Sequence, residues 1–117
     1  MLLEIEEEKH ASGVTIVRLK GRLTLGREIQ RLEDHLRQAR DGGTDKVVLD
    51  LAGVDFVDSS GLGMLTQSFS TFNNSGGGFC LAAVTTRVEQ ILKLTRLDTI
   101  LPSAASVDEA VVKLTAP

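Results

Sequence analysis

Hydrophobic and polar residues alternate at the start of the chain, and this period predicts strands. Residues 3–6 alternate between apolar side chains and glutamates, and residues 14–16 alternate again. A period of two is typical of half-buried strands, which a turn near Gly13 would join into a hairpin. We expect Gly21 to end the second of these strands.

Further along, apolar residues recur at spacings of three and four, which is the period of an amphipathic helix. The predicted helices are 27–40, 60–74, 88–95 and 107–114. Two nearly continuous apolar runs predict strands buried on both faces, and Ile100–Leu101 is a candidate edge strand. The predicted buried strands are 46–51 and 79–84. The order β-β-α-β-α-β-α-β-α predicts an α/β fold with a mostly parallel sheet, to which the N-terminal hairpin adds an antiparallel pair.

Composition favours one globular domain over residues 1–117. The chain has 117 residues, of which 42% are hydrophobic and 25% charged, with a net charge of −3. It has neither a basic stripe for phosphates nor Trp or Tyr for base stacking, so we expect no direct nucleic-acid binding. The lone Cys80 excludes an internal disulfide, and the acidic start and short apolar runs favour neither a signal peptide nor membrane insertion. We therefore expect a cytoplasmic location.

The sequence offers no catalytic or metal-binding constellation. His10 and His35 lie in different elements without useful partners, and Cys80 lies in a predicted core strand without an adjacent base. Gly61-Leu62-Gly63 lacks the third glycine of a dinucleotide-binding loop, and Ser59-Ser60 lacks the first glycine of a nucleophile elbow. We expect a protein that is not an enzyme and that needs neither a cofactor nor a metal.

The helix 60–74 presents two faces at 100° per residue, and its first turn follows Asp58 and Ser59, which are favourable N-cap residues. The expected core face comprises Leu62, Leu65, Phe69 and Phe72. The expected outward face comprises Ser60, Met64, Gln67 and Thr71. We expect glutamate to be tolerated at positions 64 and 71.

That outward face is unusual because no charged residue occurs between Asp58 and Arg87. Depletion of charge is typical of the centre of a protein interface, although a neutral helix without a partner shows the same pattern. Gly61 and Gly63 would let another molecule approach the backbone of the first turn. A phosphate on Ser60 would be tolerated at the positive end of the helix dipole, yet it would place charge in the middle of a neutral binding face. Such a serine is a candidate binary switch, which other proteins would have to phosphorylate and dephosphorylate.

The buried strand 47–51 and the segment 54–63, which ends in Asp-Ser-Ser-Gly-Leu-Gly, resemble the signature of STAS domains, specifically of bacterial anti-sigma factor antagonists. The similarity also covers Gly21-Arg22-Leu23, 77–81 and 88–97, and so nearly the whole chain. The resemblance implies the STAS fold, a central sheet of four or five strands with helices packed on it.

The resemblance further implies that Ser60 is phosphorylated by an anti-sigma factor that is also a serine kinase, and restored by a metal-dependent serine phosphatase. The unmodified antagonist would bind the anti-sigma factor and free a sigma factor. Family members often carry an acidic residue where this chain has Thr24, a departure that concerns partner identity. The expected partner-binding residues are Thr24, Asp58, Ser59, Ser60, Gly61, Gly63, Met64, Gln67 and Thr71.

Two other functions stay open at this point. A STAS accessory subunit of a lipid-transport or stress-signalling assembly would dock through the same helix without a serine switch. A small-ligand or nucleotide-binding module is compatible with the Gly-Leu-Gly turn but is not indicated by it. The intact serine at position 60 favours the phosphorylated antagonist.

Overall fold

Alternating strands and helices form one five-stranded sheet with helices on both faces, in a computed structural model that describes residues 2–116. The strands are β1 (Glu4–Lys9), β2 (Thr15–Leu23), β3 (Lys46–Val57), β4 (Gly78–Ala82) and β5 (Ser103–Ala104). The helices are α1 (Arg27–Asp41), α2 (Ser59–Asn74), α3 (Thr86–Leu94) and α4 (Val107–Thr115), with a 3₁₀ turn at Leu97–Thr99. The strands follow the order β1-β2-β3-β4-β5, and only the β1–β2 pair is antiparallel. The predicted α/β fold with an N-terminal hairpin is confirmed.

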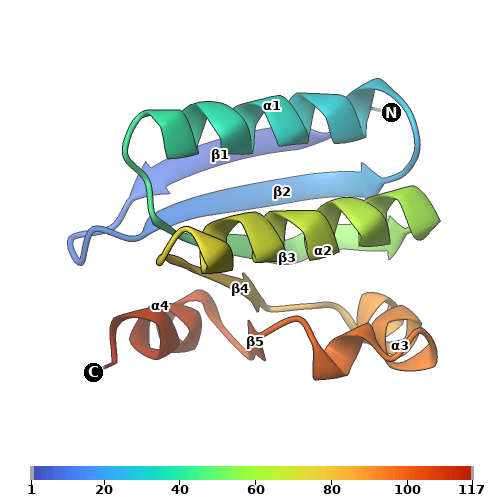
Figure 1. Cartoon of the computed structure of the whole chain (residues 1–117). Coiled ribbons are helices and arrows are strands. Elements are labelled where there is room, and N and C mark those ends of the chain that lie inside the picture. Colours follow the sequence, from blue (N-terminus) through green and yellow to red (C-terminus); the bar gives the residue numbers. More distant parts are fainter. Residues whose placement is uncertain (1, 117) are drawn as a thin grey trace.

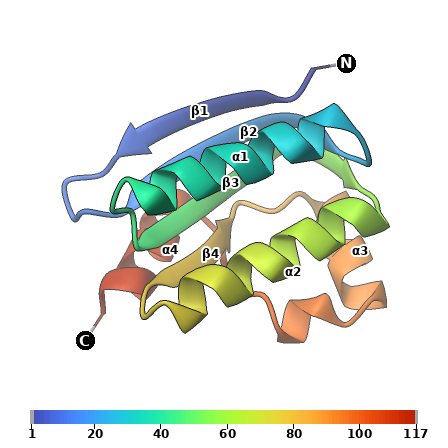
Figure 2. The same cartoon turned by 45° about the horizontal axis from the view of Figure 1, so that its top comes forward.

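The helices lie in two layers, with α1 and α2 side by side on one face of the sheet (Figure 1) and α4 behind the sheet (Figure 2). Val47 and Leu49 belong to the large core that also holds the buried leucines of α1 and α2. Val48, between them, belongs to a smaller core with Ala110 and Val111 of α4. Successive side chains of β3 thus enter opposite cores, which explains the continuous apolar run in the sequence.

The ends of two strands differ from the sequence-based expectation. Gly21 does not end β2: it has φ of 131°, the β2–β3 register shifts directly after it, and pairing continues to Leu23. Glycine tolerates this positive φ, so the ladder absorbs an irregularity instead of stopping. The last strand is Ser103–Ala104, not Ile100–Leu101, because the Leu101 N–H bonds to Leu97 O in the preceding turn. Leu101 is buried but does not pair in the sheet. Its hydrophobic character therefore indicated a buried position and not a strand.

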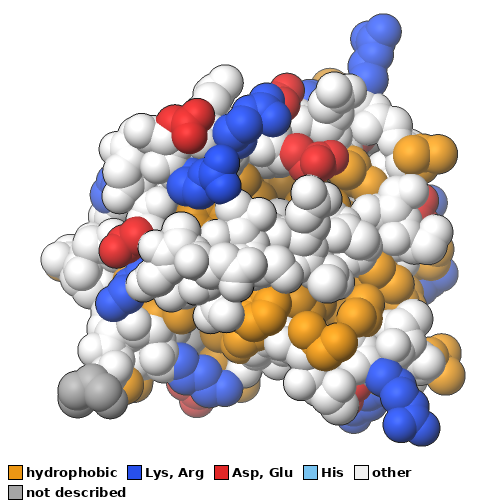
Figure 3. All heavy atoms as spheres, in the orientation of Figure 1, with side chains coloured by type: hydrophobic (Ala, Val, Ile, Leu, Met, Phe, Trp, Pro, Cys, Tyr) orange, Lys and Arg blue, Asp and Glu red, His pale blue; other side chains and the backbone are white. Residues whose placement is uncertain are grey.

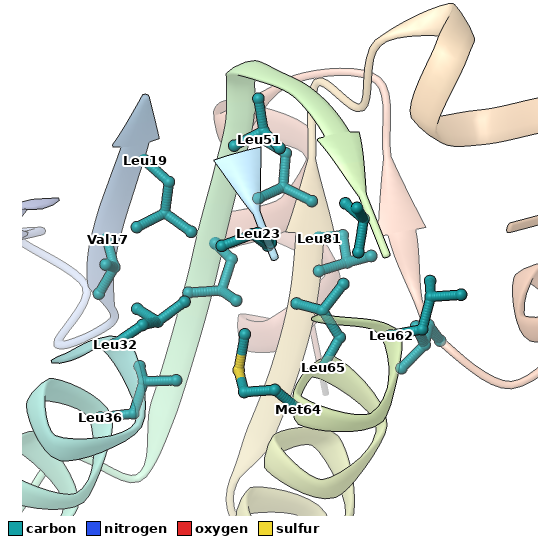
Figure 4. Close-up of a cluster of buried hydrophobic side chains, with 14 of the residues drawn as sticks. Val17, Leu19, Leu23, Leu32, Leu36, Leu51, Leu62, Met64, Leu65 and Leu81 are labelled. Atoms are coloured by element: carbon teal, nitrogen blue, oxygen red, sulfur yellow. The ribbon is translucent and has the colours of Figure 1, made fainter. Parts of the chain in front are cut away.

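The assignment of Met64 to the outward face of α2 is wrong. Its side chain is 4% exposed and belongs to the large core. Figure 4 shows it between the two helices, close to Leu32 and Leu36 of α1. A helix that packs on a sheet and also against a neighbouring helix buries two flanks, so its apolar side is wider than a single stripe. Phe69, assigned to the core face, is half-buried and contacts Phe79 edge-on, with ring centroids 6.2 Å apart.

This packing predicts opposite outcomes for two glutamate substitutions on α2. Met64→Glu should destabilise the fold by several kcal/mol, because it places an unpaired charge in the core. Thr71→Glu, at a half-buried position, should change the free energy of unfolding by no more than about 1 kcal/mol. Leu65→Ala, at a fully buried position, is the reference for core truncation and should cost about 2–5 kcal/mol. Urea denaturation compares the three, and equal stability of the two glutamate variants would contradict this account.

Candidate functional site

The start of α2 is held by Asp58, which binds two different elements through its two carboxylate oxygens. Oδ1 accepts a hydrogen bond from Gly61 N at 2.9 Å, so that Asp58, of the two candidate N-cap residues Asp58 and Ser59, is the one that caps α2. Oδ2 accepts a second bond, also 2.9 Å long, from Leu25 N in the loop between β2 and α1. The backbone N–H of Asp58 donates to Leu23 O at 3.1 Å. Asp58 therefore ties this loop to the first turn of α2.

These bonds lower the pKa of the Asp58 carboxyl below its usual value. The largest cause is the hydrogen bond from the Leu25 N–H, while partial desolvation opposes the shift and the Gly61 N–H adds to it. Donors that face a carboxylate stabilise its charged form. Because the pKa is lower in the folded state than in the unfolded one, the ionised carboxylate stabilises the fold.

Gly61 is a packing residue, which corrects its assignment to the partner-binding surface. It is buried, and a Cβ at this position would lie 2.4 Å from Leu23 O and 2.7 Å from Val57 Cγ1. The first turn of α2 thus rests directly on the end of β2. Gly63 is exposed and a Cβ there would have no neighbour within 4 Å, so this position does leave the helix surface open.

The two serines of the motif lie at the open end of α2. Ser59 is exposed and Ser60 is half-buried, and within residues 2–116 neither hydroxyl takes part in a hydrogen bond. Thr24, half-buried, lies in the loop that Asp58 fastens to this turn. The structure therefore groups Thr24 with Asp58, Ser59 and Ser60, although more than thirty positions separate the loop from the helix in the chain.

The exposed surface of α2 continues from this end as an uncharged polar strip. Gln67 is exposed and Thr71 half-buried, and the whole helix lacks Asp, Glu, Lys and Arg. Figure 3 shows this strip as uncharged polar surface with a band of hydrophobic surface along its lower side. The absence of charge that the sequence indicated therefore lies on an accessible surface, but Met64 does not contribute to it.

Sequence reasoning missed a cationic cluster at the end of β3. Arg22 and Arg87 both lie against the ring of Phe56, with guanidinium carbons 5.9 and 5.4 Å from its centroid. Arg22 also pairs with Asp55, with 3.7 Å between Nε and Oδ1. Phe56 comes two residues before Asp58 in the chain. Arg22, Phe56 and Arg87 belong to three separate elements, so their spacing in the sequence did not indicate that they meet.

The residues considered for catalysis or metal binding stay apart in the fold. His10 Nδ1 lies 2.8 Å from Ser12 Oγ, and His35 Nε2 lies 3.0 Å from Glu7 Oε1. Cys80 is fully buried, and burial raises the pKa of its thiol. Across residues 2–116 no three His, Cys, Asp or Glu side chains are grouped as metal ligands. In the same part of the chain, no helix combines the length and apolarity that a membrane span requires.

The two glycines of the motif should respond oppositely to alanine. Gly61→Ala should destabilise the fold by about 1–3 kcal/mol or more, because the new methyl group overlaps backbone that cannot move aside cheaply. Gly63→Ala should stabilise α2 by up to about 1 kcal/mol, because alanine is the better helix former and the space is free. Chemical denaturation of both variants tests the contrast, and a tolerated Gly61→Ala would contradict the close approach to Leu23.

The Asp58 bonds predict a pH-dependent contribution to stability. Asp58→Asn should cost about 0.5–2 kcal/mol at neutral pH, because an amide can replace only one of the two acceptor oxygens. The contribution of the carboxylate is present above the unfolded-state pKa of about 3.9 and is lost as the pH falls through the lower folded-state pKa. Urea denaturation of both proteins across this range should therefore show a gap in stability that narrows towards acid. A gap that does not change with pH would contradict the role of the charge.

Comparisons with known proteins show the family to which the chain belongs. The family model described as "STAS domain" matches residues 6–110. The "Anti-sigma F factor antagonist" of Paenibacillus polymyxa is 34% identical over 107 residues, which is 87% of this chain and 86% of that protein.

Two solved structures show the same fold at low sequence identity. An anti-sigma factor antagonist from Mycobacterium paratuberculosis superposes with a TM-score of 0.84 at 24% identity, over 96% of this chain and 93% of that one. The Bacillus cell fate determinant SpoIIAA in its phosphorylated form superposes with a TM-score of 0.71 at 17% identity, over 94% of this chain and 98% of that one. The resemblance stated from the motif is confirmed, and the chain belongs to the STAS domain family.

Proposed function

We propose that this chain is an anti-sigma factor antagonist whose binding is switched by phosphorylation of Ser60. Unphosphorylated, it binds an anti-sigma factor and so releases a sigma factor. The observation that carries the proposal is the position of Ser60, in the first turn of an uncharged helix with a hydroxyl that no group in residues 2–116 binds. The name of the Paenibacillus relative supports it, as does the existence of a structural neighbour in a phosphorylated form.

A phosphate on Ser60 would alter binding more than folding. At the N-terminus of α2 it meets the positive end of the helix dipole, which favours it by about 0.3–1 kcal/mol at an exposed site. The helix itself offers no Lys or Arg to neutralise the added charge, and the Asp58 carboxylate is close in the chain. In a closed interface the same phosphate would be desolvated without a partner, which costs several times the dipole term.

The binding surface in this proposal comprises the exposed and half-buried residues around Ser60 and along α2. They are Thr24, Ser59, Ser60, Gly63, Gln67 and Thr71. Asp58 positions the loop that carries Thr24, while Gly61 and Met64 support the surface from inside the fold. The protein is regulatory and performs no chemistry of its own. The serine kinase activity belongs to the anti-sigma factor, a metal-dependent phosphatase restores the serine, and all act in the cytoplasm.

Substitutions at Ser60 should separate binding from folding. Ser60→Ala should fold, bind the anti-sigma factor constitutively and take up no phosphate on incubation with that kinase and ATP. Ser60→Asp should fold normally and lose most of its binding, because a carboxylate enters the neutral surface. Intact mass reports the phosphate, and titration calorimetry with the anti-sigma factor reports the affinity.

The matched control is Ser59→Ala, which removes the neighbouring hydroxyl. Asp58, not Ser59, caps the helix, so this variant should change stability by no more than about 0.5 kcal/mol and should still be phosphorylated. Phosphate on the Ser60→Ala protein at the wild-type rate would refute the assignment of the switch. Failure of the wild-type chain to bind the anti-sigma factor would refute the proposed function itself.

A further inference from the structure

A groove of about 160 Å³ lies between α1 and α2, away from the serine motif. Its apolar lining comes from Leu36, Met64 and Phe72, each no more than 4% exposed. Ser68, Gln67 and Thr71 add uncharged polar groups from α2. The Ser68 hydroxyl donates to Met64 Sδ at 3.5 Å, which leaves its oxygen as an acceptor. The groove thus combines a buried apolar floor with a polar wall.

The charges at this groove are unevenly distributed along its length. α1 and α2 run in the same direction (Figure 1), so Glu33 lies toward their N-terminal ends, and Arg37 and Arg40 toward their C-terminal ends. Arg37 is hydrogen-bonded to Asp34, whereas Arg40 forms no ion pair within residues 2–116. Figure 3 shows basic side chains beside hydrophobic surface above α2. One end of the groove is therefore cationic and has a guanidinium available for an anion.

We propose that this groove binds a small amphiphilic monocarboxylate. The carboxylate pairs with Arg40 and Arg37, as guanidinium groups do in bidentate contacts, and the apolar part rests on Leu36, Met64 and Phe72. Glu33 at the other end disfavours a second negative charge on the ligand.

The volume limits what the apolar part is. A cavity of about 150 Å³ accommodates benzene, whereas sites for drug-sized ligands begin at about 300 Å³. The part of the ligand that enters the groove is therefore one aromatic ring or a short alkyl chain.

Benzoate is the probe for this site, and benzyl alcohol is its neutral counterpart. Titration of the ¹⁵N-labelled full chain with sodium benzoate should give saturable amide shift changes confined to residues 33–40 and 64–72, with a Kd in the millimolar range. Benzyl alcohol should bind at least about fivefold more weakly, because it cannot pair with the guanidinium groups. No saturable shifts, shifts spread over the whole surface, or equal binding of the alcohol would overturn the proposal.

Two arginine variants of equal charge complete the test. Arg40→Gln should weaken benzoate binding at least about fivefold, while Arg27→Gln, in the first turn of α1 and outside the groove, should leave it unchanged. Equal effects of the two variants would show nonspecific attraction and would refute the site. Shifts in the groove that depend on protein concentration without benzoate would instead assign it to a second copy of the chain. Gln67 and Thr71 belong both to the groove and to the proposed binding surface, whereas Ser60 does not line the groove. Ser60→Ala should therefore bind benzoate with an unchanged Kd, and a weaker Kd would overturn the placement of the site.

Discussion

The first turn of α2 rests on the last residue of β2, and the arrangement of the candidate site depends on this contact. Leu23 O accepts the Asp58 N–H and lies so near Gly61 that no Cβ fits between them. The Asp58 carboxylate then fastens Leu25 to the same turn. One bond joins two backbone groups at 3.1 Å and the other joins a backbone N–H to the Asp58 carboxylate at 2.9 Å, so the loop that bears Thr24 is tied to the turn that bears Ser60.

The uncharged exposed surface of α2 is narrower than the exposed surface of a helix that buries only one face. One side of the helix packs on the sheet, and a second flank, through Met64, packs against α1. What is left to solvent is a strip of hydroxyl, amide and glycine positions. Such groups are cheaply desolvated compared with charges, which suits them to an interface that forms and dissociates.

Charge near this strip comes from neighbouring elements. Arg37 and Arg40 lie on α1, and Arg22 and Arg87 lie against Phe56 at the end of β3. Because α2 itself contains no Lys or Arg, a phosphate in its first turn has no cationic partner on the same helix. In the proposed function the chain displays a serine on a rigid frame, and the chemistry of adding and removing phosphate belongs to its partners.

The local pattern of hydrophobic and polar residues was enough to predict the order of the helices and strands and most of their buried faces. The alternation in the first strands, the spacing of Ile29, Leu32 and Leu36, and the doubly apolar run around Val48 each report which side of an element is buried. Asp58 was recognisable as a cap because capping involves only residues three positions apart. These features depend on near neighbours in the chain, which is why the fold class and the position of the serine motif were accessible from the sequence.

Tertiary structure decided the features that arise between distant segments. The sequence does not distinguish the roles of Gly21, Gly61 and Gly63. Gly61 is a packing residue because Leu23 lies against it in the fold. β2 continues past Gly21 because its pairing with β3 resumes after the register shift. Met64 has the helical phase of a surface residue and is buried because α1 lies beside it. The bond from Leu25 to Asp58 and the groove between α1 and α2 likewise join residues that are far apart in the chain. Hydrophobic periodicity shows which side of a single helix or strand is buried. It does not show which other element packs against that side, and the burial of Met64, the packing of Gly61 and the Leu25–Asp58 bond depend on that neighbour.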